Sequence, residues 1–411
     1  MSQIAGVPAD KIEIPLGATA LARRLVMSQL QGVRGGKLHL VEGARRHVFG
    51  DGGDLEATVE VHDPRFYRDV FFGGNLGAGE SYMDGSWSCD DLAALCRISV
   101  RSGRDGRDWG WGGLMRPLYR AAHALRHNSR RGSRRNIAAH YDLSNEFFSL
   151  FLDPTMMYSS AVYPRPDASL EEASVHKLDL ICRRLRLKPE DHLVEIGTGW
   201  GGLALHAARS YGCRVRSTTV SRQQYELARE RVRQAGVADR VEVVLEDYRD
   251  LGGRYDKLVS VEMVEAVGHQ YYDAYFGRCS RLLKDDGLML LQAITINEQA
   301  YERHRRSVDF IKKYIFPGSN IPSLGAMQGA VGRATDLRVA ALDDIGLHYA
   351  RTLAEWRRRF MERRPQVRRL GFGPEFCRMW EFYLAYCEAG FAERYITDVH
   401  LLLAKPGRRD V

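Results

Sequence analysis

Long apolar runs are missing from this 411-residue chain. A helix that crosses a bilayer needs about 18 consecutive apolar residues, and no stretch of the sequence approaches that length. Near the N-terminus, Asp10, Lys11 and Glu13 stand where a secretory signal would carry its apolar core. The seven cysteines are scattered, without a CxxC pair or a companion histidine cluster. We therefore expect a cytoplasmic chain with free thiols and no bound metal.

Positive charge is concentrated in one segment. The formal net charge is +8, and residues 101–135 alone hold ten arginines against two aspartates. One helical face of this segment would carry Leu114, Leu118, Ala122 and Leu125, and the opposite face Arg116, Arg120, His123 and His127. Such a basic amphipathic segment favours a peripheral position on an anionic membrane surface, at its inner face. A solvated linker is the alternative, and nucleic acid is not expected because no recognition motif accompanies the charge.

The composition and periodicity divide the chain into three predicted parts. These are a first domain (1–100), the basic amphipathic linker (101–135) and a catalytic domain (136–411). The first domain mixes helix and strand patterns, with strands expected at 38–41 and 56–62 and a turn-rich stretch at 73–87.

Beyond residue 136 the pattern is helical at first. Strands and helices then alternate to about residue 296, as in a parallel sheet with crossover helices. Ser169 and Glu172 have the spacing of a capping box, which marks a helix start. Residues 297–345 form an insertion rich in aromatic and basic side chains, and a final strand is expected at 399–404. The fold class is therefore α/β.

The most informative stretch runs from Leu193 to Gly202. Apolar residues lead into Glu195, and glycines follow at 197, 199 and 201, so the pattern predicts a strand, a tight turn and a helix. Glycines at such a turn let a ligand approach the backbone at the carboxyl end of a parallel strand. Gly202 also completes a GxGxxG pattern, which on its own is a weak sign of a dinucleotide site.

The acidic residues decide between two cofactors. A dinucleotide site should carry an acid about 20 residues after the glycines, at the end of the next strand. That strand, 213–220, ends in threonines without an acid, whereas Glu195 precedes the glycines and Asp247 follows the third strand, 241–245. This arrangement is typical of S-adenosylmethionine (SAM) methyltransferases, and we favour SAM over a nicotinamide or flavin.

Several segments together resemble the cyclopropane fatty-acyl-phospholipid synthase family, whose relatives include the mycolic acid methyltransferases. They are Leu76–Gly85, His140–Asn145, Met157–Ala161, the glycine turn, Val264–Gly268, Lys313–Gly318 and Tyr386–Phe391. The resemblance covers nearly the whole chain, and the first domain points to the branch that acts on phospholipids. It implies a class I SAM-methyltransferase sheet with a helical, aromatic insertion, preceded by a smaller α+β domain that binds lipid or forms a homodimer.

The resemblance also implies which residues hold SAM. Glu195 is a candidate from the pattern described above, and the resemblance adds Tyr158, Ser159, Gly197, Gly199, Gly201, Thr219, Ser221, Gln224, Asp247 and Tyr248. Thr219, Ser221 and Gln224 would lie near the ribose and methionine, and Asp247 with Tyr248 near the adenine.

A bicarbonate ion acts as the base in that family, and the resemblance places its ligands at Glu265, Tyr349 and the backbone of Ile294. Two further catalytic positions depart from the family pattern: Ser160 replaces a cysteine and Gln292 a histidine. Both residues can donate hydrogen bonds to an anion, but glutamine does not titrate near neutral pH. The departures therefore bear on the product more than on methyl transfer.

The expected reaction is methyl transfer from SAM to the double bond of an unsaturated phospholipid acyl chain. A carbocation forms, and loss of a proton from the transferred methyl closes a cyclopropane; a methylene- or methyl-branched chain is the alternative. Aromatic rings can stabilise the cation, and the candidates are Tyr314, Phe316, Tyr383 and Phe391. A SAM-binding, lipid-associated protein without turnover is the hypothesis from another functional class.

Overall fold

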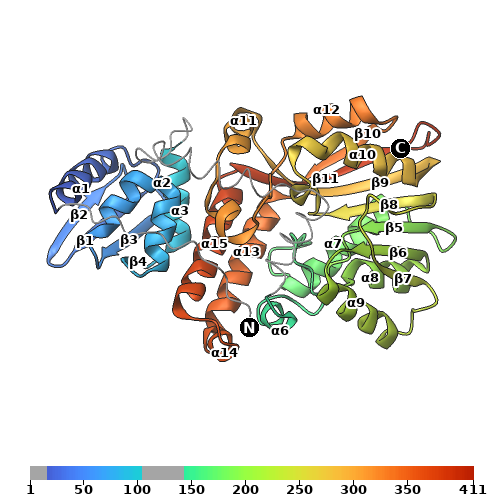
Figure 1. Ribbon diagram of the computed structural model, residues 1–411, viewed down its shortest axis with the longest axis horizontal. Coiled ribbons are helices and arrows are strands. Elements are labelled where there is room, and N and C mark those ends of the chain that lie inside the picture. Colours follow the sequence, from blue (N-terminus) through green and yellow to red (C-terminus); the bar gives the residue numbers. More distant parts are fainter. Residues whose placement is uncertain (1–15, 104–142) are drawn as a thin grey trace.

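The computed structural model describes residues 16–103 and 143–411. Most of the predicted basic linker, including both of its helical faces, lies outside the described residues, as does the start of the His140–Asn145 segment. Within the described ranges the chain forms two β-sheets with helices around and between them (Figure 1). We call residues 16–103 the N-terminal unit and residues 143–411 the C-terminal unit.

The N-terminal unit is a small α+β arrangement. Its four-stranded sheet has the order β2-β1-β3-β4, in which β1 pairs antiparallel with β2 and parallel with β3. Its elements are α1 (Leu16–Leu30), β1 (Lys37–Glu42), β2 (Arg45–Phe49), β3 (Glu56–Val61), α2 (Arg65–Met83), β4 (Trp87–Cys89) and α3 (Leu92–Ser102). The two strands expected from the sequence are therefore present as β1 and β3.

The prediction of a turn-rich stretch at 73–87 is wrong for most of its length, because α2 runs through it. The glycines of this stretch instead allow a kink in the helix and close packing against neighbouring atoms. Gly74 has φ 56° and bends the helix, and this bend brings Gly77 against the carbonyl oxygen of Asp69. A side chain at Gly79 would collide with Phe310 of the C-terminal unit. Glycine was thus a misleading turn signal here.

The C-terminal unit is built on a seven-stranded sheet of order β10-β11-β9-β8-β5-β6-β7. The strands are β5 (His192–Ile196), β6 (Arg214–Thr219), β7 (Val241–Leu245), β8 (Tyr255–Val261), β9 (Leu283–Ile296), β10 (Arg338–Asp344) and β11 (Ile396–Ala404). Strands β5 to β9 run parallel, and at one edge β11 pairs antiparallel with β9 and β10 pairs antiparallel with β11. The strand order reverses between β5 and β8, the position at which such sheets bind ligands.

Helices cover this sheet on both faces (Figure 1). The helices of the unit are α6 (Asn145–Ser149), α7 (Leu170–Arg184), α8 (Gly202–Tyr211), α9 (Arg222–Gln234), α10 (Tyr272–Leu282), α11 (Glu298–Arg306), α12 (Leu324–Ala334), α13 (Gly346–Glu362), α14 (Arg364–Arg369) and α15 (Pro374–Ala392), with short turns η1 (Val264–Ala266), η2 (His269–Tyr271) and the π-helical η3 (Ile311–Ile315). The capping box is confirmed: Ser169 accepts from the Glu172 N–H and Glu172 from the Ser169 N–H. The predicted insertion holds α11, η3, α12 and β10.

Helix α15 joins the two units. It packs against α13 on one side and against α2 and α3 of the N-terminal unit on the other. Phe382 lies at its centre, with its ring centroid 4.7 Å from that of Phe310 and 5.9 Å from that of Tyr82. One apolar core therefore runs from the small sheet through α15 to the larger unit.

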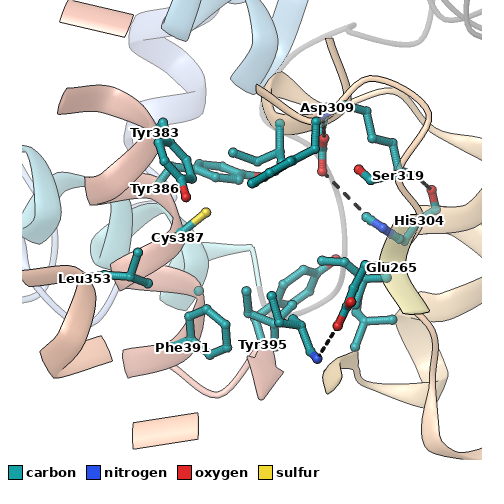
Figure 2. A pocket seen from close by; sticks show the side chains of 18 of the residues that line it. Glu265, His304, Asp309, Ser319, Leu353, Tyr383, Tyr386, Cys387, Phe391 and Tyr395 are labelled. Atoms are coloured by element: carbon teal, nitrogen blue, oxygen red, sulfur yellow. Dashed lines mark hydrogen bonds and ion pairs between the residues drawn. The ribbon is translucent and has the colours of Figure 1, made fainter. Parts of the chain in front are cut away.

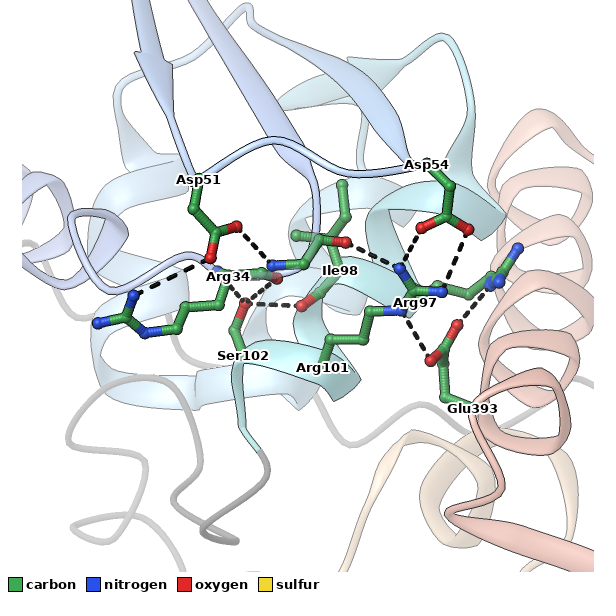
Figure 3. Close-up of polar contacts among 9 residues, drawn as sticks. Arg34, Asp51, Asp54, Arg97, Ile98, Arg101, Ser102 and Glu393 are labelled. Carbon is green, nitrogen blue, oxygen red and sulfur yellow. Dashed lines mark hydrogen bonds and ion pairs between the residues drawn. The ribbon is translucent and has the colours of Figure 1, made fainter.

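Ion pairs border this shared core (Figure 3). Glu393, just past α15, accepts from Arg97 (2.7 Å) and Arg101 (2.8 Å) of α3, and Arg101 also pairs with Asp54. On another side, Lys313 pairs with Glu80. The pairs of Glu393 with α3 and of Lys313 with Glu80 link the two units, and their side chains are partly withdrawn from water. Within the described ranges, no helix is both long and apolar enough to cross a membrane.

Gly77→Ala should destabilise the protein, and Gly73→Ala provides the matched control in the same helix. A methyl group at Gly77 would overlap the Asp69 carbonyl, whereas the position of a methyl at Gly73 is open. We expect Gly77→Ala to lower the free energy of unfolding by roughly 1–3 kcal/mol, and Gly73→Ala to leave it unchanged or raise it by up to about 1 kcal/mol. Urea denaturation measures both, and equal stability of the two variants would contradict the kinked packing of α2.

Candidate active site

The glycine turn follows β5 directly. Gly197, Gly199 and Gly201 have φ angles of 103°, 51° and 84°, which side chains other than glycine rarely adopt. The N–H groups of Gly197 and Thr198 donate to the carbonyl of Thr218 at the end of β6, each at 3.0 Å. The turn therefore lies at the carboxyl end of two adjacent parallel strands, as predicted, and α8 begins at its far end.

Glu195 lies beside this turn and is almost fully buried. The Ser217 hydroxyl contacts its Oε2 at 2.5 Å and the Thr198 hydroxyl at 2.7 Å. Burial raises the pKa of Glu195 to about 8, against the opposing influence of Ser217 and of the Lys177 charge. Glu195 also faces the cavity described below, where its predicted role in holding SAM remains a prediction.

The other predicted SAM residues surround the same position. Thr219 donates to Gln224 (2.8 Å), and Asp247 pairs with Arg249 (2.7 Å). Tyr248 packs edge-on against Tyr275 at a centroid distance of 5.4 Å. Two members of the set do not line the cavity: Gly201 packs against Ala228, and Ser221 is the N-cap of α9.

A cavity of about 1050 Å³ opens in front of the turn. Besides the predicted SAM residues other than Gly201 and Ser221, it is lined by Glu262, Glu265 and Tyr349, and by residues of α11 and α15. Figure 2 shows Glu265 on one wall and Tyr383, Tyr386, Cys387 and Phe391 of α15 on the other. The cavity continues into the N-terminal unit, where most of the residues that line it are apolar, among them Val26, Leu38, Leu40, Val59, Phe66 and Ile98.

Glu262 is the main site residue that the sequence analysis missed. It directly follows β8 and has a φ of 47°, unusual for a residue other than glycine. Its Oε1 accepts from the Ser160 N–H (2.8 Å) and from Gln292 Nε2 (2.8 Å), and its Oε2 accepts from the Tyr349 hydroxyl (2.7 Å). A signal was present in the sequence, since Glu262 is an acid at the end of the fourth strand, three residues before Glu265.

The structure thus brings Ser160, Gln292 and Tyr349 together, as predicted, but around a carboxylate of the chain itself. Ser160 and Gln292 are fully buried behind Glu262 and do not line the cavity, whereas Tyr349 does. Glu262 is half-buried, and because it lines the cavity, its remaining exposed surface faces that space. Of the donors that the resemblance places around bicarbonate, Tyr349 and Gln292 donate to this carboxylate, whereas the Ile294 N–H donates to Glu265 and the Ser160 hydroxyl to the Ala161 carbonyl.

Glu265 occupies a second position at the cavity wall. Its Oε1 accepts from the Ile294 N–H at 2.6 Å, which joins two of the three predicted bicarbonate ligands directly. Its Oε2 is buried and has no hydrogen-bond partner among the residues that the structure describes. Burial, and then the charge of Glu262, raise the pKa of Glu265 to about 8. Glu265 is therefore mostly protonated at neutral pH.

Lys177 of α7 supplies positive charge behind this wall. Its side chain is fully buried, and Nζ donates to the Ser159 hydroxyl at 2.7 Å. Burial lowers the pKa of Lys177 to about 8, although the charges of Glu262 and Asp398 raise it. No spacing in the sequence relates Lys177 to Glu262, so the pair could not be found without the fold.

Aromatic rings form much of the remaining wall. The Tyr158 and Tyr383 hydroxyls are 2.9 Å apart, and the Tyr349 ring stacks on Phe391 at 4.4 Å. Phe316, Tyr383 and Phe391 line the cavity, as the sequence analysis expected. Tyr314 does not line it; its hydroxyl donates to Glu80 of the N-terminal unit at 2.8 Å.

The strand order, the glycine turn at the switch point and the adjoining cavity define a class I SAM-dependent methyltransferase. Solved structures agree with this class. The mycolic acid cyclopropane synthase CmaA1, in complex with S-adenosylhomocysteine and CTAB, superposes with a TM-score of 0.63 at 32% identity, over 66% of this chain and 98% of that one. The cyclopropane synthase MmaA2 from Mycobacterium tuberculosis gives 0.62 at 30% identity, with the same coverage.

The family model for mycolic acid cyclopropane synthetase matches residues 128–401, and the chain belongs to this family. Tuberculostearic acid methyltransferase UfaA1 of Mycobacterium tuberculosis is 38% identical over 96% of this chain and 94% of that protein. The cyclopropane-fatty-acyl-phospholipid synthase of Escherichia coli K12 is 36% identical over 84% of this chain and 87% of that protein. The protein is thus an enzyme that uses SAM, within a family that transfers methyl or methylene groups to lipid acyl chains.

Gly199→Ala should weaken SAM binding, with Gly236→Ala as the matched control. Both glycines have positive φ (51° and 67°) and open space at the Cβ position, but Gly199 lines the cavity and Gly236 does not. Each change should cost roughly 1–2 kcal/mol of stability from backbone strain. Only Gly199→Ala should raise the dissociation constant for SAM, by about ten-fold or more, since its methyl group enters the binding space. Calorimetric titration tests this, and equal affinities in the two variants would contradict the location of SAM.

Proposed function

We propose that this enzyme transfers the methyl group of SAM to the double bond of an unsaturated phospholipid acyl chain, with Glu262 accepting the proton that must then leave. The observation that carries the proposal is the set of three hydrogen bonds to the Glu262 carboxylate at the cavity wall. These bonds fix its orientation and favour its ionised form, as a base requires.

The shape of the cavity supports an acyl chain as substrate. Its branch in the N-terminal unit offers aliphatic and aromatic side chains, which suit a hydrocarbon that must be withdrawn from water. We therefore assign lipid binding to the N-terminal unit, in keeping with the predicted domains 1–100 and 136–411. Peripheral binding to an anionic membrane through residues 101–135 is part of the same proposal, and a homodimer remains a prediction from the resemblance.

The chemistry places two demands on the site. SAM would supply a methyl group on a positively charged sulfur. The weakly nucleophilic alkene would form a bond to this methyl carbon as the carbon–sulfur bond breaks, so that S-adenosylhomocysteine leaves and the positive charge passes to the acyl chain. Water must be excluded, because it would capture the cation. The rings of Tyr383, Phe391 and Phe316 provide apolar walls whose π-faces stabilise positive charge, by up to about 2 kcal/mol each where water is absent.

Glu262 takes the place of the bicarbonate expected from the resemblance. Tyr349 and Gln292 already donate to its carboxylate, and Ser160 does so through its backbone. A separate bicarbonate ion would have to compete with Glu262 for these donors and would add a second negative charge nearby. We therefore propose that turnover does not depend on bicarbonate.

A methylene-branched chain is the product that we favour. The carboxylate of Glu262 is part of the chain, so its position differs from that of a freely bound ion. In addition, the relative that matches 96% of this chain is named as a tuberculostearic acid methyltransferase. In this outcome a hydride shift moves the cation to the methylated carbon, and Glu262 takes a proton from the new methyl group. Closure to a cyclopropane is the second candidate, favoured by the family model and the Escherichia coli relative.

Glu262→Gln and Glu265→Gln separate the two carboxyl groups as bases. Glu262→Gln should lower turnover by about 10²–10⁴-fold while SAM affinity is retained, because a neutral amide cannot accept the proton. Glu265→Gln should have a much smaller effect at pH 7, since its carboxyl is already neutral there and the amide oxygen can still accept from Ile294. Release of S-adenosylhomocysteine measures turnover, and the reverse ranking would refute Glu262 as the base.

Mass spectrometry of the acyl chains identifies the product. The protein is incubated with SAM and vesicles of an unsaturated anionic phospholipid, in buffer with and without added bicarbonate after removal of CO₂. We expect a gain of one CH₂ unit with a double bond that hydrogenation reduces, at the same rate in both buffers. A gain that resists hydrogenation would establish the cyclopropane instead, a requirement for bicarbonate would exclude Glu262 as the sole base, and no gain would refute the substrate class.

A further inference from the structure

Asp398 lies directly behind the proposed base. It belongs to β11 and pairs in register with Ile294 of β9. His400, two residues further along β11, pairs with Gln292. The Gln292 side chain connects the two carboxyl groups: its Nε2 donates to Glu262 Oε1 and to Asp398 Oδ2, each at 2.8 Å. Asp398 is fully buried and does not line the cavity. It therefore contacts the base but not the substrate.

One oxygen of each carboxyl group lies 2.8 Å from the same Gln292 nitrogen, so the two groups are close to each other. An ionised carboxylate only accepts hydrogen bonds, so a hydrogen bond between two carboxyl groups requires a proton on one of them. Glu262 has three donors from Ser160, Gln292 and Tyr349, whereas the structure gives Asp398 a side-chain donor only in Gln292, and its buried Oδ1 has no donor among the described residues. The proton therefore belongs on Asp398 and the negative charge on Glu262.

The surrounding charges favour the same assignment. Lys177 faces the pair from α7, and Glu265 faces it from η1. On the remaining sides stand Tyr349 of α13 and His400 of β11, and burial lowers the pKa of His400 to about 3, so that it is neutral. With Asp398 and Glu265 both protonated, the charge of Glu262 is balanced by Lys177. A second ionised carboxyl group would leave an unbalanced charge in a low-dielectric interior.

Burial and the charge of Glu262 raise the pKa of Asp398 well above its usual range. Burial also raises the pKa of Glu262 above its usual range, but the charge of Lys177 and the hydrogen bonds from Ser160 and Tyr349 oppose that shift. The pair therefore holds one proton, which lies on Asp398 rather than on Glu262, and the two groups titrate as a unit.

We propose that Asp398 is a positioning residue that remains protonated at neutral pH and donates a hydrogen bond to Glu262, which keeps the base ionised during the reaction. This inference rests on the proposed role of Glu262. In the step itself a C–H bond of the cationic chain breaks, its electrons form the new carbon–carbon bond of the product, and the proton passes to Glu262. Asp398 keeps its own proton and lowers the pH at which Glu262 becomes an effective base.

The pH dependence of turnover tests the proposal with two variants. Asp398→Asn retains a neutral donor toward Glu262 and an acceptor toward Gln292, so we expect turnover within about three-fold of the unmodified enzyme and an unchanged acid limb of the profile. Asp398→Ala removes the donor and destabilises ionised Glu262. Its acid limb should move to higher pH by on the order of one unit, with turnover recovering at high pH. SAM affinity, measured in parallel, shows that each variant is folded.

Two results would overturn the proposal. Loss of turnover in Asp398→Asn at every pH, with SAM affinity intact, would show that Asp398 acts as an anion. An unshifted acid limb in folded Asp398→Ala would show that it does not tune Glu262. If Asp398→Ala does not fold, infrared difference spectra between the unmodified enzyme and Asp398→Asn at pH 7 decide: the proposal requires a protonated-carboxyl band that the variant lacks. Activity of Glu262→Gln is a separate readout, because it would refute the base itself whatever the Asp398 variants show.

Discussion

Burial of helix α15 on two sides is the packing constraint on which both units depend. One side completes the core of the larger unit against α13, and the other covers α2 and α3 of the small one. Phe382 contacts aromatic rings from both units, and the glycine at position 79 lets them approach. The cavity extends beside this helix, so its continuity across the two units follows from the same packing. An acyl chain held there would contact both units at once.

Electrostatics organise the other wall of the cavity. Lys177, Glu262, Glu265 and Asp398 are withdrawn from bulk water, where unpaired charges are costly. Among these four groups, the arrangement leaves one negative charge at the cavity wall, that of Glu262. That charge suits the proposed reaction at each stage, because the sulfonium of SAM, the cation on the chain and the departing proton would all be positive. A fixed carboxylate can stabilise this charge without reorganisation of solvent.

Local signals in the sequence were accurate where a structure depends on neighbouring residues. The turn after β5 requires positive φ at alternate positions, and the glycines there reveal it. The Ser169–Glu172 capping box and strand β7 also fall where they were predicted. The same reasoning failed at α2, because its glycines relieve contacts with Asp69 and Phe310, and these contacts exist only in the folded chain.

The sequence by itself determined the α/β class, the SAM turn and most of the residues around it, since strand periodicity and backbone conformation are set over a few positions. Only the tertiary structure decided which groups surround Glu262, the proposed base. The hydrogen-bond partners of Glu262 come from 30, 87 and 102 residues away in the chain, on β9, on α13 and in the segment before α7. Which side chains meet there depends on the order of strands in the sheet and on the helix packed against it, and that order follows from burial of the whole chain rather than from any local pattern.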